Sequence, residues 1–112
     1  MQPLTRGTIC YPVRVNEVLL GFKKRGREVG VWNGFGGKVE QGETFEEAAR
    51  RELKEEADIE AIDMTLVTLV RYLSPHPHWN WDVQVFITRE WVGTPSETEE
   101  MRPAWYRLAA LP

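Results

Sequence analysis

The chain of 112 residues contains one cysteine, Cys10, and has no apolar run long enough to cross a bilayer. A single cysteine cannot form an internal disulfide, and Cys10 stands in an apolar stretch where a small buried side chain is the expected role. Residues 1–6 lack the apolar core of a signal peptide. We therefore expect a cytoplasmic protein that makes no contact with a membrane.

A surplus of positive charge is also absent. The formal net charge is −3 at pH 7, which gives no reason to expect a nucleic-acid polymer as partner. A small phosphate ligand is compatible with this charge, because a bound metal ion can reverse the local field. The apolar fraction of 42% and the charged fraction of 28% are typical of globular proteins. The length indicates a single domain over residues 1–112.

Runs of β-branched residues predict strands on both sides of one helix. The strands are expected over residues 4–15, 18–22, 65–73, 83–88 and 104–108, and loops over the basic segment 23–30, the Pro-rich segment 74–81 and the acidic segment 96–100. The clearest helix covers residues 44–57, where Thr44 and Glu47 have the spacing of a capping box. Its apolar residues share one side: Phe45, Ala48, Ala49 and Leu53. These elements indicate a mixed α/β class, also described as α+β.

The Glu-rich side of this helix is the strongest functional candidate. Glu52, Glu55 and Glu56 stand at positions i, i+3 and i+4, which places three carboxylates on one face within a single turn. Like charges at these spacings repel, and a cation among them would stabilise the helix. Oxygen ligands of this kind suit Mg²⁺ or Mn²⁺, which would polarise a phosphoryl oxygen and activate a water. A solvated acidic face without a ligand is the common alternative.

A longer pattern surrounds these glutamates. Five residues separate Gly37 from Glu43, seven more lead to Arg51-Glu52-Leu53, and Glu55-Glu56 and Asp58-Ile59 each follow after one residue. This spacing resembles the Nudix box in every defining position except one, because Asp58 stands where the family has glycine. The family glycine follows the end of the helix, where left-handed backbone is favoured, and aspartate tolerates that conformation better than most residues.

The likeness extends over nearly the whole chain. The chain is similar to the MutT-type sanitising hydrolases, among them the oxidised-purine nucleoside triphosphatases. It is carried by residues 23–26, 32–39, 82–86, 93–95 and 100–105. The resemblance implies the Nudix fold, a mixed β-sheet between helices. It also implies an acid anhydride hydrolase that uses Mg²⁺ or Mn²⁺ and converts a nucleoside triphosphate into a monophosphate and pyrophosphate.

The resemblance assigns roles around the helix. Glu52, Glu55 and Glu56 match the catalytic carboxylates of the family, and Glu55 is the leading candidate for the base that deprotonates water. Arg51, together with Glu43, matches a pair that ties the glycine-rich loop to the helix. The metal ligands implied are the Gly36 carbonyl, Glu52, Glu55, Glu56 and Glu100, the last arriving from a distant loop.

Four residues are candidates for the base pocket. Asn33 suits a purine edge, because its amide can both donate and accept hydrogen bonds. Thr8 and Phe35 match positions that line the same pocket in the family. Trp105 either stacks on the base or packs in the core.

Three further residues are candidates for substrate binding. Lys23 and Lys38 would compensate phosphate charge, although an ordinary surface role explains each equally well. Gly37 belongs to a run of closely spaced glycines, which indicates a backbone that turns tightly or closely approaches a ligand.

In the family, the chain continues beyond the segment that matches Leu111-Pro112, through a purine-gripping acidic pair and a C-terminal helix. We therefore expect that helix to be missing here, and an uncovered sheet face would favour a homodimer. Three functions stay open: hydrolysis of a purine nucleoside triphosphate, hydrolysis of another nucleoside diphosphate-linked substrate, and a catalytically weak binding module.

Overall fold

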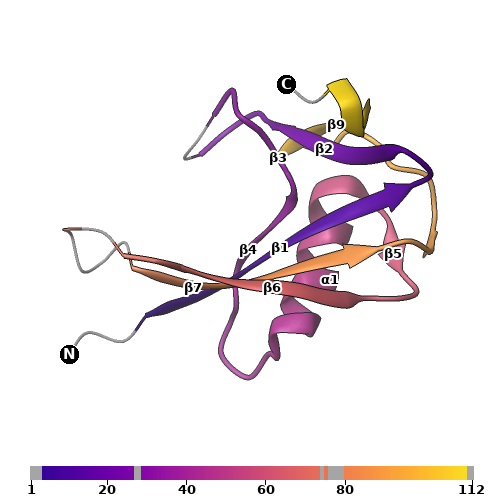
Figure 1. Cartoon of the computed structure of the whole chain (residues 1–112). Coiled ribbons are helices and arrows are strands. Elements are labelled where there is room, and N and C mark those ends of the chain that lie inside the picture. Colours follow the sequence, from indigo (N-terminus) through magenta and orange to yellow (C-terminus); the bar gives the residue numbers. More distant parts are fainter. Residues whose placement is uncertain (1–3, 27–28, 74, 76–79, 111–112) are drawn as a thin grey trace.

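The computed structural model describes residues 4–26, 29–73, 75 and 80–110 (Figure 1). The strands are β1 (Thr5–Arg14), β2 (Glu17–Lys23), β3 (Trp32–Asn33), β4 (Phe35–Lys38), β5 (Glu60–Ala61), β6 (Thr65–Tyr72), β7 (Trp81–Thr88), β8 (Trp91–Val92) and β9 (Met101–Arg107), and the helix is α1 (Phe45–Ala57). A short 3₁₀ turn, Leu108–Ala110, follows β9. The mixed α/β class is confirmed.

A bent, seven-stranded sheet forms the body of the molecule, with strand order β3-β2-β1-β7-β6, β4 on β1, and β9 on β2. Strand β1 is central because it runs parallel to β7 and antiparallel to β4. It pairs with β2 only near the turn, through Val13 and Arg14. The sheet therefore has two wings, β2-β3-β9 and β4-β1-β7-β6, and α1 lies on one side of them (Figure 1).

The predicted capping box fixes the start of α1. The Thr44 hydroxyl accepts from the Glu47 amide, and the Glu47 carboxylate accepts from the Thr44 amide. At the other end, Asp58 adopts left-handed backbone with φ 60°, as expected for the position where the family has glycine. Its amide donates to the Lys54 carbonyl, which closes the last turn.

The core lies between α1 and the sheet. Its apolar residues include Ala49 and Leu53 from the helix and Cys10, Phe35 and Phe86 from the strands. Burial raises the pKa of the Cys10 thiol to about 12, so the expected role of Cys10 as a small buried side chain is confirmed.

The glycine-rich segment 32–39 forms strands β3 and β4 rather than a turn. Gly36 lies so close to β1 that an added Cβ would be 1.9 Å from the Thr8 carbonyl oxygen. The glycine run therefore serves a close approach of two strands, which was one of its two expected uses. Strand β9 begins at Met101 rather than at residue 104, because it pairs with β2 as far as Lys23. The short strands β5 and β8, paired with each other, were not predicted.

Strand β6 is an edge strand, and all its residues are exposed. Most of the predicted Pro-rich loop, residues 74–81, lies outside the described residues. Within the part of the chain that the structure describes, α1 is the only α-helix, and no helix is long and apolar enough to cross a membrane.

Candidate active site

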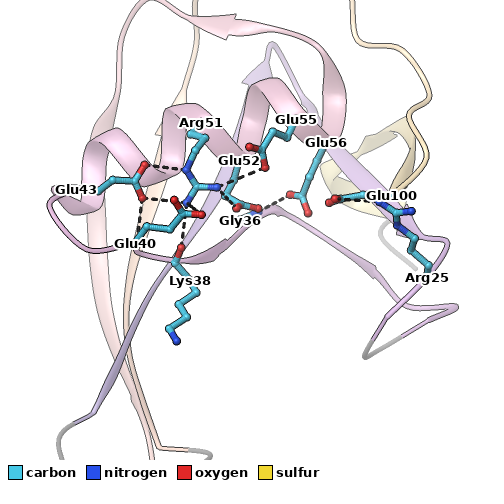
Figure 2. Close-up of polar contacts among 10 residues, drawn as sticks. All are labelled: Arg25, Gly36, Lys38, Glu40, Glu43, Arg51, Glu52, Glu55, Glu56 and Glu100. Carbon is cyan, nitrogen blue, oxygen red and sulfur yellow. Dashed lines mark hydrogen bonds and ion pairs between the residues drawn. The ribbon is translucent and has the colours of Figure 1, made fainter.

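Arg51 contacts several members of an acidic cluster (Figure 2). The cluster consists of Glu43, Glu52, Glu55, Glu56 and Glu100. The Arg51 Nε donates to Glu43 Oε2 at 2.8 Å and its Nη2 to Glu43 Oε1 at 3.0 Å, a bidentate pair that fixes both side chains. The same guanidinium also donates to Glu52 and to the Lys38 carbonyl. The hydrogen bonds from Arg51 lower the pKa of Glu43 to about 2. The predicted tie between the loop and the helix is confirmed in its geometry.

Glu56 is the most buried carboxylate of the cluster, with 2% of its surface exposed. Its Oε1 accepts from the Gly36 amide at 2.8 Å. Burial, followed by the negative charge of Glu52, raises the pKa of Glu56 to about 8, and the charge of Lys23 opposes this rise. A carboxylate kept out of water without a bonded cation favours a positively charged ligand.

Glu52 lies directly over the glycine-rich strand. A Cβ on Gly37 would be 2.9 Å from the nearer Glu52 carboxylate oxygen, so any side chain at position 37 would displace Glu52. Burial raises the pKa of Glu52, while the hydrogen bond from Arg51 opposes the rise. The absence of a side chain at Gly37 thus leaves the space that the Glu52 carboxylate occupies.

Glu55 and Glu100 stand at the border of the cluster. Glu55 Oε2 is 3.4 Å from the Arg51 guanidinium, and half of its side chain is exposed. Glu100 comes from the loop before β9, and its charge raises the pKa of both Glu52 and Glu56. Figure 2 shows its carboxylate beside that of Glu56. Residues distant in sequence are thus brought together, as the resemblance implied.

A set of contacts between two loops, here called the Lys24 lock, holds Glu100 in place, and it was not predicted from the sequence. The Lys24 ammonium pairs with Glu97 and donates to the Thr98 carbonyl, and the Lys24 amide donates to the Glu100 carbonyl. Arg25 lies 3.5 Å from the Glu100 carboxylate. The complementary charges of segments 23–25 and 97–100 were the available signal.

The donor chemistry of this cluster fits a hard divalent cation, because carboxylate oxygens dominate it. As arranged, no three His, Cys, Asp or Glu side chains among the described residues are close enough together to hold one ion. The carboxylates are instead held by three different donors: Glu52 and Glu55 by Arg51, Glu56 by Gly36 and Glu100 by Arg25.

Asn33, the predicted contact to the base, is held by two hydrogen bonds through its side-chain oxygen. Its Oδ1 accepts from the Tyr11 hydroxyl at 3.0 Å and from the Gly34 amide at 2.8 Å. Tyr11 was not among the predicted residues. The alternation of side chains along β1, with Cys10 in the core, places the Tyr11 ring on the face away from α1.

Two predicted base-pocket residues are placed differently. The prediction that the Phe35 side chain lines the pocket is wrong, because the ring is fully buried in the core. Alternation along β4 turns Phe35 toward α1. Thr8 pairs with Gly37, is 5% exposed and lies on the α1 side of β1 together with Cys10. It therefore belongs to the carboxylate side of the site rather than to the side of Tyr11.

Trp105 and the two lysines complete the predicted set. The Trp105 ring stacks on Trp91 with centroids 5.8 Å apart and lies under the Arg14 guanidinium, which favours the packing interpretation. Lys23 ends β2, and its positive charge opposes the rise in the pKa of Glu56 that burial causes. The Lys38 side chain points away from the carboxylates (Figure 2), and only its carbonyl takes part, as an acceptor from Arg51.

These features place a cluster of carboxylates from one helix against a glycine-rich strand. The chain belongs to the NUDIX family, because the NUDIX domain model matches residues 3–112. Enzymes of this family generally use a divalent metal ion.

Several known proteins are similar to the chain. The oxidized purine nucleoside triphosphate hydrolase of Mus musculus is 42% identical over 105 residues, which are 94% of this chain and 67% of that protein. The 8-oxo-dGTP diphosphatase of Escherichia coli is 37% identical over 79 residues, 68% of this chain and 57% of that protein. The crystal structure of a MutT NUDIX hydrolase from Burkholderia pseudomallei has a TM-score of 0.89 and 29% identity, and covers 98% of this chain and 88% of that one.

Proposed function

We propose that this protein, one Nudix domain over residues 1–112, hydrolyses a purine nucleoside triphosphate, including an oxidised one, to a monophosphate and pyrophosphate. The observation that carries the proposal is the buried Glu56 carboxylate, held against Gly36 beside Glu52 on a helix anchored by Arg51. The substrate class is supported by the similarity to the mouse oxidized purine nucleoside triphosphate hydrolase. The proposed cofactor is Mg²⁺, with Mn²⁺ as a substitute.

The metal would be held by Glu52, Glu55, Glu56, Glu100 and the Gly36 carbonyl. When bound, it would supply charge neutralisation and a water of lowered pKa. Glu55 is the proposed general base, because its half-exposed carboxylate can receive the proton of an attacking water. As the water oxygen bonds to phosphorus, the bridging P–O bond breaks and pyrophosphate leaves. Lys23, near Glu56, would compensate the phosphate charge.

The direct test is the release of pyrophosphate from a panel of normal and oxidised purine triphosphates, in Mg²⁺ and in Mn²⁺, with identification of the monophosphate product. Nucleotide sugars and dinucleotides in the same panel test the second function considered above. We expect turnover of purine triphosphates to exceed that of the other compounds. Release of phosphate instead of pyrophosphate, or binding without turnover, would contradict the proposal.

We also propose that two copies of the chain associate through the exposed edge strand β6. Half of the exposed large apolar residues in the described part of the chain lie in β6 or directly after it: Leu66, Val67, Leu69, Val70, Tyr72 and Leu73. Arg71 is the single charged residue of β6, so antiparallel pairing of two such strands opposes no like charges once Arg71 faces Thr65. Sedimentation velocity should give a dimer, and Leu69→Lys a monomer, whereas Ile62→Lys, a change outside β6, should remain dimeric. A monomeric unmodified protein would refute this.

The proposed location is the cytoplasm, on the argument from the single cysteine.

A further inference from the structure

We infer that Tyr11 is a positioning residue that fixes the amide of Asn33, so that the site selects a base edge presenting a hydrogen-bond acceptor. The inference rests on the proposed function, because it concerns the base of the same nucleotide. It adds a residue to the site and narrows the chemistry of the ligand.

The orientation of the Asn33 amide follows from its neighbour. A backbone N–H can only donate, so the atom 2.8 Å from the Gly34 nitrogen must be the amide oxygen. The Tyr11 hydroxyl donates to this same oxygen at 3.0 Å. Two donors occupy the two lone pairs of Oδ1, and the Nδ2 group is left to bind a ligand as a donor. The amide therefore offers a base only N–H groups, although an asparagine in general can offer both kinds.

The contact between Tyr11 and Asn33 is built into the strands. The amide oxygen of Asn33, in β3, meets a hydroxyl from β1, which is 22 residues away in sequence. Gly34 makes this approach possible, because a Cβ there would lie 2.8 Å from the Tyr11 ring and 2.9 Å from Ile9. Partial burial raises the pKa of Tyr11 above its usual value, against an opposing hydrogen bond from the Gly34 amide, so the hydroxyl keeps its proton and remains a donor at neutral pH.

The test uses Tyr11→Phe, with Tyr106→Phe as the matched control. The control removes a phenol hydroxyl from β9 but keeps the ring that contacts Trp32, the neighbour of Asn33. The substrates are dGTP and three triphosphates that each lose or weaken one acceptor: the 3-deaza analogue at N3, the 7-deaza analogue at N7, and the 6-thio analogue, whose sulfur is a weaker acceptor than O6.

We expect one acceptor deletion to lower kcat/KM of the unmodified protein by about 5- to 10-fold, mainly through KM. The measured quantity is the ratio of kcat/KM for dGTP to kcat/KM for the analogue. In Tyr11→Phe this ratio should fall toward one with kcat retained, and in Tyr106→Phe it should equal that of the unmodified protein. If Tyr11 acted only in folding, Tyr11→Phe would lower kcat/KM by the same factor for every substrate. An unchanged ratio in Tyr11→Phe, or no penalty for any acceptor deletion in the unmodified protein, would overturn the inference.

A second readout needs no turnover. In the nucleotide-free protein, Tyr11→Phe should shift the NMR signals of the Asn33 carboxamide and speed hydrogen exchange at the Gly34 amide, whereas Tyr106→Phe should change neither. Unmoved Asn33 signals would refute the inference even in an active enzyme. Absence of turnover with every triphosphate would refute the proposed function, and the NMR comparison would still decide the role of Tyr11.

Discussion

The carboxylate side of this site and its proposed base side are held in place by different kinds of contact. On the carboxylate side, Arg51 makes charged hydrogen bonds to Glu43 and Glu52, residues of the same loop and helix. On the base side, Asn33 depends on neutral hydrogen bonds, one of them from the distant Tyr11. Hydrogen bonds between charged groups are stronger than hydrogen bonds between neutral groups, so a substitution that removes a neutral bond costs less free energy. The comparison indicates that local spacing arranges the proposed catalytic groups, whereas tertiary contacts arrange the proposed contact to the base.

The strongest test of this division is Glu56→Gln, which keeps the shape of the side chain and removes its charge. We expect kcat to fall by roughly 100-fold or more, because a ligand charge of the metal site is lost, with KM for the nucleotide little changed. Steady-state kinetics in Mg²⁺ measure both. Glu99→Gln, an exposed acid of the neighbouring loop, is the control and should keep full activity. Unchanged turnover in Glu56→Gln would show the metal-site argument to be wrong.

Arg51→Lys keeps the positive charge but removes the bidentate fork. Because a lysine cannot hold Glu43, Glu52 and the Lys38 carbonyl together, activity should fall by about 10- to 100-fold. The matched control is Arg50→Lys, on the adjacent helix position, where the guanidinium pairs with Glu46. Equal losses in both variants would contradict a special role for Arg51.

Asn33→Ala addresses the base side alone. Loss of the amide should raise KM for purine triphosphates by roughly 2- to 10-fold, with kcat retained, because a neutral hydrogen bond is removed from binding rather than from the reacting atoms. Initial rates over a range of substrate concentrations separate the two constants. A fall in kcat with constant KM would break the proposed division of the site.

The carboxylate side should also make the ion-free protein sensitive to pH. Since the folded-state pKa of Glu56, about 8, exceeds its ordinary value of 4.5, the folded protein keeps a proton that the unfolded chain has released between these values. This contribution to stability is complete below pH 4.5 and is lost as the pH rises through 8. Thermal unfolding in a chelator should give a Tm that falls over this range. In Glu56→Gln, Tm should decrease less with rising pH than in the unmodified protein. In Glu99→Gln, the decrease should be the same as in the unmodified protein.

Asp58→Gly should have the smallest effect, because the residue touches neither side of the site. Glycine relieves the left-handed backbone at φ 60°, and the exposed ion pair with Lys54 that it removes contributes little. We expect Tm to rise by roughly 2 to 5 °C with unchanged kinetics. A lower Tm would mean that the side chain of Asp58 has a stabilising role beyond its backbone conformation.

Much of the fold was predictable because its signals are local. The capping pair Thr44 and Glu47, the apolar side of α1 and the left-handed Asp58 all depend on residues a few positions apart. The start of β9 and the short strands β5 and β8 were missed, because they exist through pairing with distant strands. Strand propensity depends strongly on such partners.

The site divides in the same way. The spacing in the sequence determined that Glu52, Glu55 and Glu56 share a helix face and that Arg51 can reach Glu43, because a helix repeats every 3.6 residues. Only the tertiary structure decided that Phe35 lies in the core, that Glu100 joins the cluster through the Lys24 lock, and that Tyr11 orients Asn33. These outcomes depend on strand register, which sets the face that each side chain occupies and is fixed by pairing across the whole sheet.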